Sequence, residues 1–357
     1  MTDLSHSAKE MYLTCSEKYR LHYKEKLRPT LIGSALFFGS AFDEAQNRML
    51  LEKKKSLDTS EMLLMNQSPE DTFVSAFSKV WIIDEYVDIA KSEKAMYFKS
   101  DLDLDLLEAL DYKKILDFAN ELKIDVNSAE DVEAFIEECQ VIFKKGTVDI
   151  ETQRLYNYIT WLSLKNKGLT MLEAYKKDIM PQIEEVFDVQ KRISLKDGES
   201  ELRGVIDTIC SFHSEPGVKY VCDNKSSSRP YKEDSVATSE QLATYAEHEQ
   251  ISHCAYIVVE KKLRKKEPRV RCNIIKDVIS DDFIDKTFDT ITEVFHNIND
   301  GKFEKDFDAC FQYGRRCAYY EHCRTGDMKN LKYPSKEKTD GNKERTRGTD
   351  KSSEGKN

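Results

Sequence analysis

The stretch ELRGVIDTICSFHSEPGVKYVCDNKS, residues 201–226, decides how the rest of the sequence is interpreted. β-Branched and aromatic residues are frequent in both of its halves, and a Glu-Pro-Gly turn signal at 215–217 separates them. The stretch therefore predicts two successive antiparallel strands. Three charged residues interrupt the apolar pattern of these strands, namely Asp207, Asp223 and Lys225.

Further strand and helix patterns flank this hairpin. The run IEEVFDVQKRISL (183–195) precedes it and predicts another antiparallel strand, with an Asp-Gly turn at 197–198. After it, the sequence predicts a helix at about 236–250, two strands in CAYIVVEKKL and RVRCNIIKD, and a helix at about 281–299. These patterns predict a mixed sheet with flanking helices.

The N-terminal half is mostly helical in pattern. Helices are expected at about 5–27 and 34–54, and almost all of 60–181 has helical periodicity. The predicted fold is therefore α/β, of the mixed α+β kind, with a mixed sheet flanked by helices and a long helical insertion. The expected divisions are N-terminal helices at 1–57, the helical insertion at 58–182, the core at 183–332 and a disordered polar tail at 333–357.

Composition restricts the class of function. The net charge of −10 argues against a broad electrostatic grip on nucleic acid, although it does not exclude a local one. A basic segment at 261–271 is a candidate DNA contact, and a solvated hairpin turn is an equally good interpretation of it.

No run of about 20 apolar residues and no signal-peptide pattern is present, so we expect no membrane partner and a cytoplasmic location, in a prokaryote or a phage-infected host. Nine cysteines, an odd number, argue against a disulfide framework.

The charged residues of the hairpin fit phosphodiester hydrolysis. That reaction needs a divalent cation, carboxylates to hold it, and a cation or base that positions water. Asp223 and Lys225 are two residues apart, so they share one face of a strand, and the turn brings Asp207 close to them. The alternative is that these residues belong to the solvent face of an ordinary hairpin. An isolated D-x-K pattern favours that alternative.

Two helices add polar residues at helical spacing. Gln241 and Tyr245 are four residues apart and face the sheet in the predicted helix at 236–250. Gly39, Asp43 and Asn47 share a face of the helix at 34–54, where Gly39 is expected to allow close backbone approach and Asp43 to present a carboxylate to the strands. Ordinary amphipathic helices explain both patterns equally simply.

Together these residues resemble the RecB-type branch of the PD-(D/E)XK nucleases. The order is G-x-x-x-(H/D), G-x-x-D, D-x-K and Q-x-x-x-Y, and the resemblance covers about 12–57 and 184–324. It implies a restriction-endonuclease-like core and a Mg²⁺- or Mn²⁺-dependent deoxyribonuclease, commonly an exonuclease. Metal ligation falls to Asp43, Asp207 and Asp223, and Lys225 positions or activates water with support from Gln241 and Tyr245. This chain departs from the family at Asp43, where His is usual, and at Asn47, where Glu is frequent.

Four cysteines extend the resemblance. Cys310, Cys317 and Cys323 lie in CFQYGRRCAYYEHC, and Cys15 lies near the N-terminus. This arrangement resembles the iron–sulfur nucleases of the same branch, the AddB-type and CRISPR-associated exonucleases, and implies a [4Fe–4S] cluster that joins the chain ends. The family spacing is C-x-x-C-x5-C, which only the last pair keeps, so Cys310 is the least secure ligand. Three free thiols on a helical hairpin, or a Zn²⁺ site, are the alternatives.

The sequence leaves three candidate functions. The first is an iron–sulfur, metal-dependent DNA exonuclease acting in recombination, repair or phage DNA processing, with DNA and a helicase or recombination protein as partners. The second is a DNA-binding module on the same fold, catalytically defective because of Asp43 and Asn47. The third is a helical interaction protein in which the motifs are coincidental. No P-loop motif is present, so the chain does not hydrolyse ATP through one.

Overall fold

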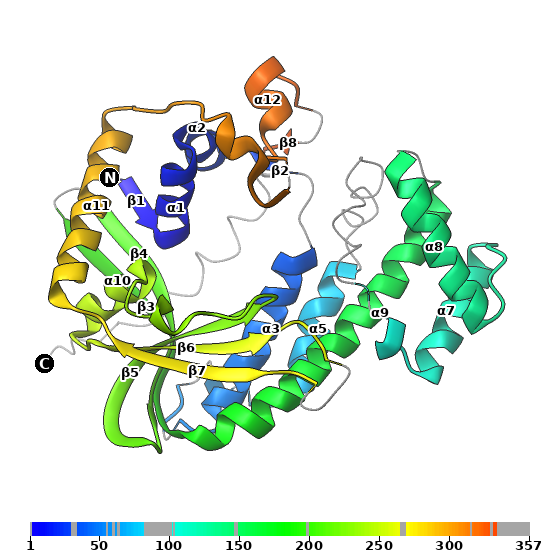
Figure 1. Cartoon of the computed structure of the whole chain (residues 1–357), viewed down its shortest axis with the longest axis horizontal. Helices are drawn as coiled ribbons and strands as arrows, with labels where there is room; N and C mark the ends of the chain where they lie inside the picture. The colour runs from blue at the N-terminus through cyan, green and yellow to red at the C-terminus, as the bar shows by residue number, and fades with distance from the viewer. Residues whose placement is uncertain are drawn as a thin grey trace, which may run out of the picture. The chain divides into compact units, whose positions relative to one another are not determined.

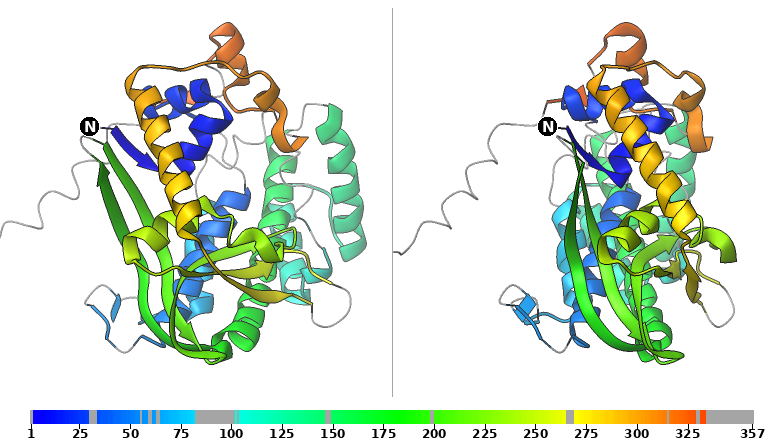
Figure 2. Two further views of the ribbon diagram at one scale, coloured as in Figure 1. Left: turned by 60° about the vertical axis from the view of Figure 1, so that its left-hand side comes forward. Right: turned by 90° about the vertical axis from the view of Figure 1, so that its left-hand side faces the viewer.

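The computed structural model of the chain is shown in Figures 1 and 2. It describes residues 2–29, 34–54, 56–58, 61–62, 65–81, 102, 104–145, 149–197, 200–264, 269–314, 316–328 and 331–333. The polar tail predicted from 333 onward lies outside the described residues from 334, and so does part of the predicted helical insertion.

Contacts divide the chain into two compact units. The larger unit comprises Met1–Leu13 and Leu31–Lys302, and the smaller comprises Thr14–Thr30 and Phe303–Asn357. This division follows packing, whereas the divisions expected from the sequence follow changes in residue pattern. Segments far apart in the chain therefore fold together in the smaller unit.

The larger unit contains a six-stranded mixed sheet. Its strands are β1 (Thr2–Ser5), β3 (Ile183–Asp197), β4 (Ser200–Phe212), β5 (Glu215–Ser227), β6 (His253–Glu260) and β7 (Cys272–Val278). β3, β4 and β5 are antiparallel, β5 and β6 are parallel, and β6 and β7 are antiparallel. The three predicted antiparallel strands and the predicted mixed sheet are both confirmed.

The N-terminal segment differs from the prediction of one helix over about 5–27. Residues 2–5 form β1, which pairs in parallel with the start of β4, and the helical stretch after it is divided into α1 (His6–Thr14), α2 (Ser16–Tyr19) and η1 (Arg20–Lys24). Cys15 separates α1 from α2 because its backbone is extended, with φ −166°. Pairing with a strand almost 200 residues away is a non-local contact, which helical periodicity does not reveal.

The other helical elements of the larger unit lie against the sheet or against one another (Figure 1). Those with described bounds are α3 (Ser34–Leu51), α5 (Pro69–Trp81), η3 (Leu104–Leu106), α7 (Ala109–Glu121), α8 (Ala129–Lys145), α9 (Ile150–Ala174), η4 (Tyr175–Ile179), η5 (Met180–Gln182), η6 (Glu233–Ser235), α10 (Glu240–Glu249) and α11 (Asp281–Asn299). The described part of the predicted insertion is therefore largely helical. Helix α10 begins later than predicted, whereas α11 has the predicted bounds.

Two hydrophobic cores lie on opposite sides of strand β5. Cys222 belongs to a core that includes residues of α3, α5 and α9, while its neighbour Val221 belongs to a core that includes α10 and α11. Successive residues of a strand point to opposite faces, so the sheet is covered on both sides here. A third core holds α7, α8 and the first half of α9 together.

Helix α10 is positioned by its N-cap. The Ser239 hydroxyl accepts a hydrogen bond from the Leu242 backbone N–H and also contacts the Tyr256 hydroxyl, at 2.6 Å, on β6. A capped helix start bonded to the sheet fixes the direction of the first turn of α10. That turn carries Gln241, whose contacts are described below.

The smaller unit is held by a short strand pair and a small core. β2 (Arg28–Pro29) pairs with β8 (Leu331–Lys332), and the unit also contains η7 (Asp308–Gly314) and α12 (Tyr320–Thr325). The Tyr319 hydroxyl donates to the Leu27 carbonyl, at 3.0 Å, and contacts Nδ1 of His22, at 2.7 Å. The two chain segments are therefore joined through the buried Tyr319 side chain.

Candidate nuclease active site

Strands β4 and β5 bring the predicted hairpin residues together. Thr208 is paired with Cys222, so the preceding Asp207 lies beside Asp223 and Asn224. Oδ2 of Asp207 accepts a hydrogen bond from the Asn224 backbone N–H, at 2.8 Å. Asp207 lies in the middle of β4, because β4 continues through a bulge to Phe212.

Lys225 is held between Asp223 and Gln241. Its Nζ lies 2.5 Å from Oδ2 of Asp223 and donates to Oε1 of Gln241, at 3.1 Å. Nε2 of Gln241 in turn donates to the Tyr245 hydroxyl, at 3.0 Å. The i, i+4 spacing of Gln241 and Tyr245 on α10 thus forms one hydrogen-bonded chain that ends at the lysine.

Gly204 is explained by close packing against Tyr245. A Cβ at Gly204 would lie 2.9 Å from Cε1 of the Tyr245 ring and 3.2 Å from Cγ1 of Ile193. Tyr245 is only 4% exposed, so its ring has little room to move. At Gly39, by contrast, nothing among the described residues lies within 4 Å of the Cβ position, so the close approach expected there is not seen.

We expect the Gly204→Ala substitution to destabilise the larger unit by about 1–3 kcal/mol, because the added methyl group would push the Tyr245 ring off Gln241. Urea denaturation followed by circular dichroism measures this loss. Gly39→Ala is the matched control, since alanine in an open helix interior should stabilise by about 0.5–1 kcal/mol. Equal effects at the two positions would refute the packing explanation.

Asp43 projects from α3 toward the same carboxylates. Nδ2 of Asn47 donates to Oδ2 of Asp43, at 3.2 Å, as the predicted shared helix face requires. Nε2 of Gln190, on β3, lies 3.5 Å from the same oxygen and donates to Oδ1 of Asp207, at 3.2 Å. One amide group therefore bridges the helix carboxylate and the strand carboxylate.

Gln190 is a residue that the sequence analysis missed. It lies opposite Asp207, because Val189 pairs with Thr208 and Lys191 pairs with Ile206. Its φ of +53° is in the left-handed region, which is uncommon for a residue other than glycine and costs conformational energy. Aligning β3 on β4 across their connecting turn would have identified the position, but not its backbone conformation.

Burial and mutual repulsion perturb the carboxyl groups. Burial, together with the nearby charge of Asp207, raises the pKa of Asp43 to about 7. Burial likewise raises the pKa of Asp223 to about 7, although Lys225 opposes this, and it raises the pKa of Asp207. Burial lowers the pKa of Lys225, but the Asp223 carboxylate outweighs this and holds the lysine pKa above its ordinary value.

The donor chemistry at this position fits a hard divalent cation. Three carboxyl groups supply only oxygen ligands, and a cation would relieve the repulsion that raises their pKa values. Oδ2 of Asp223 is buried and receives no well-directed hydrogen bond, its contact being the ion pair with Lys225. In the part of the chain that the structure describes, however, no three His, Cys, Asp or Glu side chains are already grouped to hold a metal ion.

Comparison with known families agrees with this geometry. The family model of the PD-(D/E)XK nuclease superfamily matches residues 126–324, which is more than half of the chain. The chain belongs to the PD-(D/E)XK nuclease superfamily. No curated protein matches the sequence. A solved structure titled "Crystal structure of SSO0001" is 13% identical, covers 60% of this chain and 95% of its own, and has a TM-score of 0.27, too low to support an argument.

Membership in the PD-(D/E)XK nuclease superfamily confirms the predicted restriction-endonuclease-like fold class and implies nuclease activity. Nucleases of this superfamily typically use Mg²⁺ or Mn²⁺, and DNA is the substrate that membership suggests. The matched residues include Asp207, Asp223 and Lys225 but neither Asp43 nor Cys15. None of the helices that the structure describes combines the length and apolar character needed to cross a membrane.

The four predicted cluster cysteines all lie in the smaller unit. Sγ of Cys15 lies 3.9 Å from the Glu304 carbonyl, and the Cys317 backbone N–H donates to the Cys310 carbonyl, at 2.7 Å. Burial raises the pKa of Cys310, and the neighbouring thiols of Cys317, Cys323 and Cys15 raise it further. The four thiols are therefore near one another, although they are not grouped for metal binding in the described residues.

Proposed function

We propose that this protein is a Mg²⁺- or Mn²⁺-dependent DNA exonuclease. The observation that carries the proposal is the convergence of Asp207, Asp223 and Lys225 on β4 and β5, with Lys225 bonded to Gln241. We further propose that Asp43 completes the carboxylate set from α3. The bound cation would polarise the phosphoryl oxygen and acidify the attacking water.

The residues of the chain have separate tasks in this proposal. Asp207 and Asp223 hold the cation, and Gln190 donates to both the Asp43 and the Asp207 carboxyl groups, which holds them beside each other. Lys225 acts as a cation, not as a general base, because its raised pKa keeps it protonated at neutral pH. Its remaining N–H bonds can then orient water and stabilise the charge that develops on the phosphoryl group.

We also propose that Cys15, Cys310, Cys317 and Cys323 hold a [4Fe–4S] cluster. The support is that residues distant in the sequence meet in one small unit, where Ser16 and Glu304 exchange hydrogen bonds beside Cys15. A cluster at this position would join the N-terminal and C-terminal segments of that unit. On the resemblance, the nuclease would act in recombination, repair or phage DNA processing, with a helicase or recombination protein as a partner.

The activity is tested on end-labelled linear DNA and on closed circular DNA, single- and double-stranded, with Mg²⁺ or Mn²⁺ added. We expect linear DNA to be shortened from an end and closed circles to stay intact. Chelation with EDTA should abolish cleavage, and added metal should restore it, because the carboxylates alone cannot polarise the phosphate. Cleavage of closed circles at the same rate would show an endonuclease instead.

A catalytically defective DNA-binding module is the second candidate. The observation in its favour is that no three potential ligands are grouped for a metal among the described residues. In addition, Asn47, which stands where the family frequently has Glu, uses its amide to donate to Asp43. Titration with Mn²⁺ separates the two candidates, because a defective module would bind DNA without binding the ion tightly or turning over substrate.

A further inference from the structure

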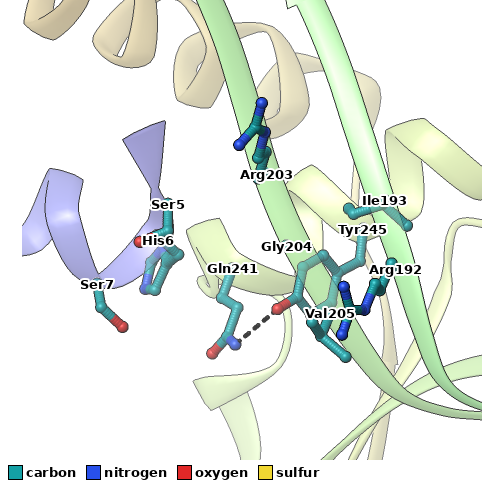
Figure 3. A pocket seen from close by; sticks show the side chains of 10 residues that line it. All are labelled: Ser5, His6, Ser7, Arg192, Ile193, Arg203, Gly204, Val205, Gln241 and Tyr245. Atoms are coloured by element: carbon teal, nitrogen blue, oxygen red, sulfur yellow. Dashed lines mark hydrogen bonds between the residues drawn. The ribbon is translucent and has the colours of Figure 1, made fainter. Parts of the chain in front are cut away.

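A cavity of about 440 Å³ lies in the larger unit beside α10 (Figure 3). It is lined by residues of the β1–α1 junction, strands β3 and β4, and helix α10. These are Ser5, His6, Ser7, Arg192, Ile193, Arg203, Gly204, Val205, Gln241 and Tyr245. Its volume is within the usual range for sites that take a small molecule.

The polar lining of this cavity is basic. Two arginines contribute to it and no carboxylate does, while burial lowers the pKa of His6 and so favours its neutral form. Arg203 is held in place by ion pairs with Asp3, at 3.0 Å, and Glu201, at 2.5 Å. Arg192 is exposed and has no ion-pair or hydrogen-bond partner within the described ranges, so its guanidinium is available for an anion.

An exposed apolar side chain lies next to the two arginines. Val205 is 37% exposed, pairs with Arg192 across β3 and β4, and is two residues from Arg203, so it shares the sheet face of both. Figure 3 shows the Arg192 side chain beside Val205, its partner across the two strands. Aromatic rings and guanidinium planes are the groups on which nucleic-acid bases stack.

The cavity is one side chain away from the proposed catalytic lysine. Gln241 lines it, and the same side chain accepts from Lys225 and donates to Tyr245. Lys9 of α1, itself 1% exposed, forms an ion pair with Glu240 at the start of α10. The two helices that border the cavity are therefore tied together next to Gln241.

We propose that this cavity is a nucleotide subsite, which takes one nucleotide of the DNA strand next to the bond that is cleaved. Its phosphate lies at Arg192 and Arg203, and its sugar and base lie against the exposed Val205 side chain and the guanidinium plane of Arg192. Two guanidinium groups beside an exposed apolar side chain complement both halves of a nucleotide. The proposal rests on the proposed nuclease function.

The first test is binding of thymidine 5′-monophosphate to the full-length, metal-free protein, measured by calorimetry. We expect saturable binding that Arg192→Gln weakens by at least about tenfold, because a charge-assisted contact is lost. Lys196→Gln, on the same strand and outside the cavity, removes the same charge and should leave binding unchanged. Thymidine and inorganic phosphate, each lacking one half of the ligand, should both bind more weakly than the nucleotide.

The second test separates the two sources of the phosphate, an internal linkage and a chain end. Arg192→Gln should raise KM for DNA cleavage with little change in kcat. If it does so equally on substrates with 5′-phosphate and 5′-hydroxyl ends, the subsite takes an internal phosphate. A KM increase confined to 5′-phosphorylated ends places the chain end there.

The outcomes also distinguish this proposal from the nuclease function. If the protein binds the nucleotide through Arg192 but cleaves no DNA, the subsite proposal stands and the proposed nuclease activity is wrong. Nucleotide binding that is absent, or equal in Arg192→Gln and Lys196→Gln, would overturn the subsite even in an active nuclease. Stronger binding of thymidine than of the nucleotide would overturn the assignment of the phosphate to Arg192.

Discussion

The Lys225→Ala variant is expected to lose DNA cleavage by about 10²–10³-fold or more in kcat, while its affinity for DNA stays close to that of the wild type. Lys225 is the cation of the site, held by Asp223 and Gln241, and it touches the reacting groups in the proposed mechanism without contributing to a broad DNA-binding surface. Steady-state cleavage of labelled DNA with saturating Mn²⁺ measures kcat, and fluorescence anisotropy in Ca²⁺ measures binding.

Folding needs a separate control in this experiment. Removing Lys225 leaves the buried Asp223 without its ion pair, and the aspartate pKa, already about 7, would rise further. Asp223 can then take up a proton, which limits the loss of stability. Lys219→Ala on the same strand removes an exposed lysine whose contact is with the Phe187 ring, and this variant should cleave normally. A folded Lys225→Ala protein with wild-type turnover would remove Lys225 from the mechanism.

The sequence predicted those parts of the site that depend on local pattern. A period of two placed Asp223 and Lys225 on one strand face, and a period near four placed Gln241 and Tyr245 on one helix face. The structure brings these residues into a continuous set of contacts, from Asp223 through Lys225 and Gln241 to Tyr245. The same kind of reasoning found α11 with its observed bounds, since Ser280 caps an evident amphipathic run.

The features that were not predicted depend on contacts between distant segments. Strand β1 forms only because β4 offers an edge, and residues 2–5 show no strand pattern of their own. Gln190 enters the site through a left-handed backbone opposite Asp207, which no residue preference indicates for glutamine. Gly204 was identified as part of a motif, but its physical reason, the Tyr245 ring, is a tertiary contact.

The Cys317→Ser variant is expected to lose most of its iron and to unfold the smaller unit, while the larger unit stays folded. Anaerobically purified wild-type protein should be brown and contain about four iron atoms per chain. Iron assay and absorption report the cluster, and hydrogen exchange over 14–30 and 303–328 reports the fold of the unit. Cys272→Ser, in β7 of the larger unit, is the matched control and should keep the colour and the iron.

The size of the effect follows from the hydrophobic core of the smaller unit. Among its described residues, the main core cluster has four buried side chains, Leu21, Leu27, Tyr319 and Leu331, and the strand pair β2–β8 has two residues on each side. So small a core seldom supports a fold without a metal or covalent link, because it buries too little apolar surface to offset chain entropy. A bound cluster would supply that link, so its loss should unfold the unit cooperatively.

The Cys310→Ser variant distinguishes a bound cluster from a set of free thiols. If all four cysteines are ligands, Cys310→Ser should reduce the iron content and expose residues 14–30 to exchange as Cys317→Ser does. If Cys310 is only a core thiol, its serine variant should keep the iron, because its Sγ contacts the Asp306 carbonyl, at 3.6 Å, and a hydroxyl can replace that contact. A colourless wild-type protein whose smaller unit is already protected from exchange would show that packing alone holds the two chain segments together.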